Sequence, residues 1–106
     1  MSTIEENRLA LHAILLSLVP NTVHIYFQPP ESTKMQYPAI VYSRSDIDDN
    51  YANNSTYNRR LMYQITVIDS DPDSPILDKI ASLPYCSFDR HFTSSNLNHD
   101  IFRIFY

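Results

Sequence analysis

Residues 59–68 alternate between apolar and more polar side chains, and this alternation limits the fold more than any other feature of the sequence. Tyr63, Ile65 and Val67 fall on one side of the repeat. A period of two residues predicts a β-strand with one face in a core. The other side combines Met62 with polar residues, so we expect either an ordinary, partly exposed sheet face or a face that meets a partner.

The other periodic segments extend this strand into a full domain. Thr3 and Glu6 have capping-box spacing before an apolar helical stripe that ends at Pro20. Ser74 and Pro75 supply an N-cap and a first-turn proline for a shorter second helix. In chain order, the expected elements are a helix at 4–19, strands at 23–28, 39–44 and 59–68, a helix at 75–83, and strands at 86–92 and 100–105.

The element order α-β-β-β-α-β-β predicts a single domain at residues 1–106. Two helices cannot bury their apolar stripes against each other and also cover five strands. We therefore expect an α+β fold, a two-layer sandwich in which a mainly antiparallel sheet of about five strands carries both helices on one face. A chain of 106 residues is also too short for two independent cores.

Residues 43–58 separate two of the expected strands and contain few aliphatic side chains, so we expect a long polar hairpin excursion there. Aspartates enter the excursion and arginines leave it. One interpretation is a solvated hairpin whose charges pair weakly within the chain. The other is a segment that crosses to a neighbouring copy, with aromatic anchors of the kind enriched at interfaces. The candidate interface residues are Asp48, Asp49, Tyr51, Tyr57, Arg59 and Arg60.

Composition excludes several classes of function. Glycine is absent, where about seven would be usual in a chain of this length. Phosphate-cradling P-loops and dinucleotide fingerprints need glycine, so nucleotide-dependent enzymes of those types are excluded. Left-handed turn positions must then go to other residues, and we expect them at asparagines 50, 53, 54, 58 and 98.

Charge and cysteine content limit the partners and the cellular compartment that we expect for the protein. The formal net charge of −4 argues against a protein that gathers nucleic acid. Cys86 is the only cysteine, which excludes an intrachain disulfide. The first residues lack the basic region of a secretion signal, and no apolar run approaches the roughly 18 residues that span a bilayer. We expect a soluble protein made in a cytoplasm, without a membrane partner.

Three groups of residues are candidates for a chemical site. Asp69, Asp71 and Asp73 imitate the start of a calcium loop, but Ser74 and Ile80 stand where the loop glycine and the bidentate glutamate belong. Their better interpretation is a shaped turn that places negative charge before a helix.

Cys86, Asp89 and His91 lie close in sequence and suggest a nucleophile with its base. An odd separation of Cys86 and His91, however, would put them on opposite faces of a regular strand. The four histidines, at positions 12, 24, 91 and 99, lack zinc-site spacing. We therefore expect no catalytic residues, no metal site and no cofactor.

A family resemblance rests on the order and spacing of several short segments. These are Tyr-Pro-Ala-Ile-Val-Tyr at 37–42, Arg-Leu-Met-Tyr-Gln-Ile-Thr-Val at 60–67, the acidic turn at 69–75, Leu-Pro-Tyr at 83–85, and the terminal strand at 99–106. In this arrangement the sequence is similar to the tail-terminator, or tail-completion, proteins of long-tailed bacteriophages of Gram-positive hosts.

The resemblance implies a structural virion protein rather than an enzyme. Such proteins form a ring, usually of six subunits, that caps the tail tube, ends its polymerisation and joins the tail to the head and neck. The implied partners are other copies of the chain, the tail tube protein and a neck (stopper) protein, with DNA passing through the channel without specific binding. We expect Arg59 and Arg60 to pair with Asp48 and Asp49 of the next copy in such a ring. The alternatives are a small monomeric or dimeric binding module and a small hydrolase.

Overall fold

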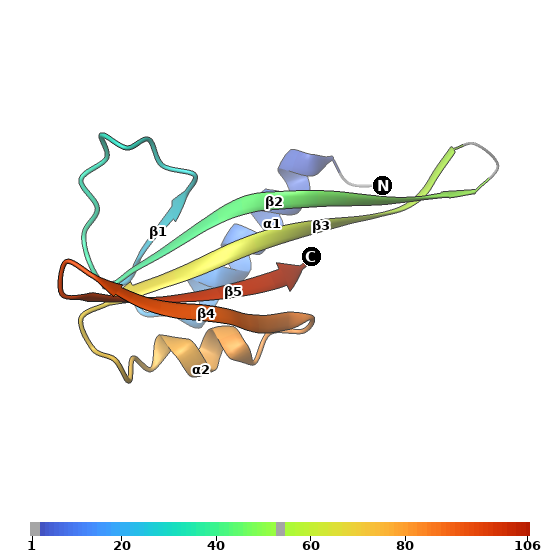
Figure 1. The fold of residues 1–106 in the computed structure, drawn as a ribbon. Helices are drawn as coiled ribbons and strands as arrows, with labels where there is room; N and C mark the ends of the chain where they lie inside the picture. Colours follow the sequence, from blue (N-terminus) through green and yellow to red (C-terminus); the bar gives the residue numbers. More distant parts are fainter. Residues whose placement is uncertain (1–2, 53–54) are drawn as a thin grey trace.

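The computed structural model describes residues 3–52 and 55–106 (Figure 1). In chain order the elements are α1 (Ile4–Leu18), β1 (His24–Phe27), β2 (Ala39–Ala52), β3 (Ser55–Asp69), α2 (Ile76–Ala81), β4 (Cys86–Ser94) and β5 (Leu97–Phe105). This order confirms the predicted α-β-β-β-α-β-β sequence of elements.

The five strands form one sheet in the order β1-β2-β3-β5-β4. β1 pairs with β2 in parallel, whereas the other three pairings are antiparallel. Leu11 and Leu15 of α1 and Ile76 and Ile80 of α2 belong to one buried cluster with strand residues such as Ile65. Both helices therefore cover the same face of the sheet, as an α+β two-layer fold requires.

Helix α1 begins where the capping pattern places it. The Thr3 hydroxyl oxygen accepts a hydrogen bond from the Glu6 backbone N–H at 3.0 Å, which satisfies one of the free donors of the first turn. The helix ends at Leu18, one residue before the predicted end. Leu11 and Leu15 are fully buried, and burying a leucine side chain completely contributes about 1.5–3 kcal/mol.

Helix α2 is shorter than the predicted 75–83, because regular helix geometry extends only over Ile76–Ala81. The buried hydroxyl of Ser74 accepts the Ile76 N–H at 3.4 Å, which keeps the expected role for Ser74 at the helix start. Before the helix, the Asp69 carboxylate accepts the Asp71 N–H and the Asp71 carboxylate accepts the Asp73 N–H. These aspartates shape the turn, as expected.

The connection between β4 and β5 is tighter than predicted. A loop over residues 93–98 was expected, but β4 continues to Ser94 and β5 begins at Leu97. Ser95 and Asn96 make the turn with φ of 53° and 63°, and positive φ at both central residues is typical of a type I′ hairpin. Left-handed backbone also occurs at Gln28 and Tyr85. Asn50, Asn58 and Asn98 are strand residues instead, so that part of the asparagine prediction is wrong, and Asn53 and Asn54 lie outside the described residues.

The largest departure from the sequence analysis is the length of β2 and β3. A long polar hairpin excursion was expected at residues 43–58, between strands ending at residue 44 and starting at residue 59, but the strands themselves make the hairpin, since β2 runs to Ala52 and β3 starts at Ser55. The two strands continue as an antiparallel ribbon, called the arm below and defined as residues 43–52 and 55–61. The arm projects past the other strands (Figure 1), and the molecule measures 51 × 26 × 24 Å along its principal axes. Backbone pairing between strands does not require apolar side chains, which is why the low aliphatic content misled the prediction.

Candidate functional site

The arm has only two strands for most of its length. The pairing of β1 with β2 ends at Phe27 opposite Tyr42, and that of β5 with β3 ends at Met62 opposite Phe105. Beyond these pairs, the Tyr106 N–H donates to the Leu61 oxygen and the Gln28 side chain accepts the Arg44 N–H at the base of the arm, and the strands further out pair with each other. Ten residues of β-strand extend about 30 Å, and an isolated two-stranded hairpin is marginally stable at best in water. The arm is therefore the part of the fold that gains most from contact with another protein surface.

The predicted interface residues all lie on the arm. The backbone register sets Asp48 opposite Arg60 and Asp49 opposite Arg59, while Tyr51 faces Thr56. Tyr57 falls at the register shift that follows Asn50. The side chains of residues 48–60 lie outside the described part of the structure. The register brings each predicted acid next to a predicted arginine of the same chain, which is the geometry of the intrachain interpretation.

A cationic and aromatic cluster marks the base of the arm. Arg8 of α1 and Arg44 of β2 both lie over the ring of Phe27, with guanidinium carbons 4.7 Å and 5.7 Å from the ring centroid. Such contacts attract a cation to the negative face of the ring. Among residues 3–47 and 61–106, whose side chains are described, no carboxylate lies within ion-pair distance of either arginine. The cluster therefore holds two positive charges without an acidic partner among those residues.

Hydrogen bonds connect this cluster to the core. Tyr42 and Tyr63 are almost fully buried. The Tyr42 hydroxyl lies 2.7 Å from His12 Nδ1, and the Tyr63 hydroxyl donates to the Asn7 side-chain oxygen at 2.7 Å. Burial raises the pKa of both tyrosines above the usual value, and the neighbouring arginine opposes this shift in each case. The arrangement fixes the first turns of α1 against β2 and β3.

Arg44 is the least satisfied member of the cluster. It is half-buried, and its Nε is fully buried without a hydrogen-bond partner among the described residues. A buried donor without a partner costs about 1–3 kcal/mol. In the sequence Arg44 is only the last residue of a predicted strand, because the contacts of Arg44 and Arg8 with Phe27 join three segments that are distant in the chain.

A β-bulge separates Arg44 from the acidic part of the arm. The register of β2 shifts between Arg44 and Asp46, so that Arg44 is opposite Tyr63 and Asp46 is opposite Met62. Tyr63 faces the helix-covered core, whereas Met62 belongs to the other face of β3. Arg44 and Asp46 therefore lie on opposite faces of the arm's base, although only one residue separates them.

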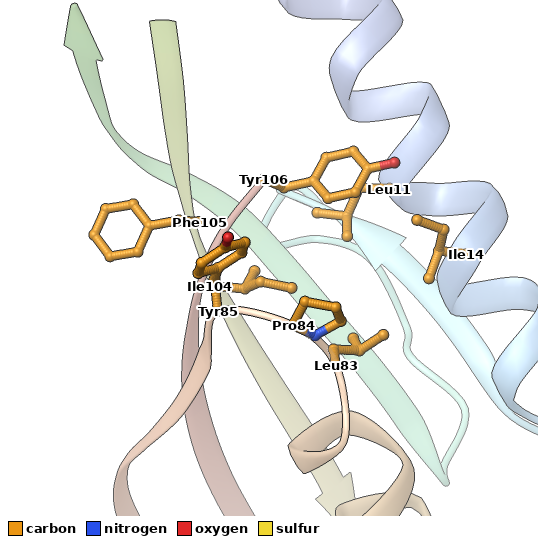
Figure 2. A pocket seen from close by; sticks show the side chains of 8 residues that line it. All are labelled: Leu11, Ile14, Leu83, Pro84, Tyr85, Ile104, Phe105 and Tyr106. Carbon is orange, nitrogen blue, oxygen red and sulfur yellow. The ribbon is translucent and has the colours of Figure 1, made fainter.

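An apolar pocket of about 370 Å³ opens on the helix-covered face (Figure 2). Leu11 and Ile14 of α1 form one wall, residues 83–85 before β4 form another, and the end of β5 with Tyr106 closes it. Tyr85 is 72% exposed at the rim. Aliphatic and aromatic side chains make up the whole lining, so the pocket suits an apolar group rather than a polar substrate.

The distance between Cys86 and His91, and not the direction of their side chains, argues against a nucleophilic thiol with its base. A bulge in β4 between Phe88 and Arg90 restores the alternation, so Cys86, opposite Ile104, and His91, opposite Asp100, belong to the same face. The predicted opposite orientation is therefore wrong. Their register partners, Ile104 and Asp100, are four residues apart, which still separates Cys86 from His91 by about 13 Å.

Asp89 and His91, the other two residues of the hypothetical thiol site, have other partners. His91 Nδ1 lies 2.7 Å from the Asp100 carboxylate, and Asp89 pairs with Arg103 at 3.6 Å. Burial raises the pKa of the Cys86 thiol, which disfavours the nucleophilic thiolate. No arrangement of nucleophile and base follows from these residues.

Two further findings concern possible ligands and membranes. Within residues 3–52 and 55–106, no group of three or more histidine, cysteine, aspartate or glutamate side chains is placed to hold a metal ion. The helices in that part of the chain are too short or too polar to cross a bilayer.

Comparisons with known proteins give weak structural similarity and no match in sequence. No protein-family model and no curated protein matches the sequence. The fold is similar, with a TM-score of 0.47 and 17% sequence identity, to a chain of an extracellular contractile injection system described as the PVC sheath/tube terminator in its extended state. The similarity covers 100% of this chain but 57% of that one, so this chain spans little more than half of its neighbour's length. The words sheath/tube terminator describe the neighbouring chain.

Proposed function

We propose that this protein is the subunit of a closed ring that caps the tail tube of a long-tailed bacteriophage, ends its polymerisation and joins the tail to the neck. The arm is the observation that supports the proposal most. A ribbon of about 30 Å with polar strands and no sheet neighbour is suited to reach across to an adjacent subunit. The order of the sequence segments resembles that of tail-terminator proteins, which form rings. In such a ring the arm contacts the neighbouring subunit.

In this proposal the copies meet head to tail around a cyclic axis, because two different surfaces of the same chain then join and the ring closes. The ring has six subunits, as is usual in the family that the sequence resembles. Tyr51 and Tyr57 act as aromatic anchors on the next copy, where large side chains contribute most of the binding energy. The protein works without catalytic residues, metal or cofactor.

The ring also contacts the tail tube on one side and the neck protein on the other, and DNA moves through its channel. The net charge of −4 suits that channel, because a negative wall offers few phosphate contacts. Assembly takes place in the host cytoplasm, and the finished ring stays in the virion.

Deleting the arm tests this function. In the variant, residues 48–60 are replaced by Asn-Gly, a pair that forms a tight hairpin turn next to the Ile47–Leu61 pair. Wild-type protein should sediment as one closed oligomer, appear as rings by electron microscopy, and stop the elongation of a phage tail tube protein mixed with it. The shortened variant should keep its fold, measured by circular dichroism and thermal unfolding, but remain monomeric.

Two outcomes would contradict the proposal. A wild-type protein that stays monomeric or dimeric at high concentration and with tube protein present would instead be a small binding module. Rings formed equally well by the shortened variant would show that residues 48–60 of the arm do not join the subunits.

A further inference from the structure

The base of the arm carries opposite charges on opposite faces. Arg44 lies on the helix-covered face, where it and Arg8 both contact the ring of Phe27, and Asp46 lies on the other face. Asp46 is exposed. Among residues 3–47 and 61–106, whose side chains are described, its carboxylate accepts only the N–H of the adjacent Ile47.

These charges cannot neutralise each other within one chain. The bulge between Arg44 and Asp46 directs the two side chains away from each other across the ribbon. A strand without the bulge would have placed residues 44 and 46 on one face. The irregularity thus keeps a positive site and a negative site apart on the same segment.

We propose that Asp46 of one copy binds Arg44 of the next copy, with Arg8 as the second positive charge of the site. The inference rests on the proposed ring and locates the seam between its subunits at the arm's base. Stacking the acidic face of one arm base on the cationic face of another joins two different surfaces. Each copy then gives one carboxylate and receives one, which is the head-to-tail contact that closes into a ring.

The chemistry of the cluster favours a carboxylate from outside the chain. Guanidinium and carboxylate groups match in shape and form two parallel hydrogen bonds. The Nε of Arg44 is buried, so the half-buried side chain would make this contact through its terminal guanidinium nitrogens. A seam that excludes water makes the pair stronger than on an open surface, and its loss leaves a buried charge unpaired.

Charge exchange between copies tests the proposal. The single variants Arg44→Glu and Asp46→Lys should each raise the concentration needed for half-assembly at least about tenfold, because each places like charges across every seam. The two variants mixed in equal amounts should form rings again, since alternating copies restore opposite charges at each seam. The chain with both changes should assemble alone. Glu31→Lys and Arg90→Glu, at exposed positions away from the cluster, are matched controls and should assemble like wild type.

The outcomes separate failure of this inference from failure of the ring. If wild type forms rings but the single variants assemble normally, or their mixture stays dissociated, the seam lies elsewhere and the ring proposal stays intact. A wild-type protein without rings would overturn both. Circular dichroism of each variant and the neutral change Arg44→Gln distinguish a lost contact from a lost fold, since a folded Arg44→Gln chain should assemble better than Arg44→Glu.

Discussion

Replacing Tyr63 with phenylalanine removes the hydrogen bond that ties helix α1 to the centre of the sheet. The Tyr63 side chain is fully buried, and its hydroxyl donates to the Asn7 side-chain oxygen at 2.7 Å. The Asn7 amide in turn donates to the backbone oxygen of Tyr106. Loss of the hydroxyl leaves the partly buried Asn7 oxygen without its donor, which should lower the free energy of unfolding by about 1–2 kcal/mol. For a domain of this size the melting temperature should fall by about 5–10 °C.

Urea and thermal unfolding of wild type, Tyr63→Phe, Asn7→Ala and the double variant measure this contribution. A coupling energy of about 1 kcal/mol between the two positions is expected. Tyr37→Phe is the control, because Tyr37 is 44% exposed and should change stability by less than about 0.5 kcal/mol. A Tyr63→Phe protein as stable as wild type, or single effects that simply add, would refute the claim that this bond holds α1 in place.

The same tyrosine predicts a pH dependence. Burial raises the pKa of Tyr63 above its ordinary value of 10.0, so above that pH the folded chain binds more protons than the unfolded chain. Stability from this group is therefore fully present below about pH 10 and is lost as the pH rises further. Tyr63→Phe should flatten the alkaline decline of the unfolding free energy. An unchanged decline would show that Tyr63 does not titrate as its burial implies.

Three further outcomes are expected. Cys86→Ser should cost about 1 kcal/mol and leave assembly unchanged, and the Cys86 thiol should react more slowly with iodoacetamide than a free thiol at pH 8, so fast labelling would contradict its raised pKa. Elemental analysis should find no tightly held zinc or calcium, and about one ion per chain would overturn the absence of a metal role. The change of Arg59 and Arg60 to glutamate should prevent ring formation. Mixing that protein with a chain carrying lysine at Asp48 and Asp49 should restore rings only if these charges pair between copies, whereas pairing within one arm, as the register suggests, predicts no rescue.

The central fold could be predicted because its signals are local. Alternation in β3 places Tyr63, Ile65 and Val67 in the core, and all three are buried. The Thr3 cap and the apolar stripe of α1 likewise depend only on neighbouring residues. Element order then leaves a two-layer arrangement as the solution that buries both helices.

A physical reason explains why the strands of the arm and the cluster at its base could not be predicted. The strands of the arm are held by backbone pairing, which a search for apolar alternation does not detect. The bulge between Arg44 and Asp46 has no sequence signal of its own, although it decides which face each charge occupies. The contact of Arg8 with Phe27 depends on the packing of α1, which is set by the whole core.

Hydrogen exchange of the arm amides tests most directly whether the arm joins one subunit to the next. Amides of residues 44–52 and 55–61 should exchange at least about tenfold more slowly in the assembled protein than in subunits separated by dilution, because a two-stranded ribbon opens readily until a partner covers it. Amides of β5, which lies beside β3 and β4 in the sheet, should exchange at the same rate in both states and serve as the internal reference. Equal protection of the arm in separated and assembled protein would contradict the account, because it would show that the arm is stable without a neighbouring copy.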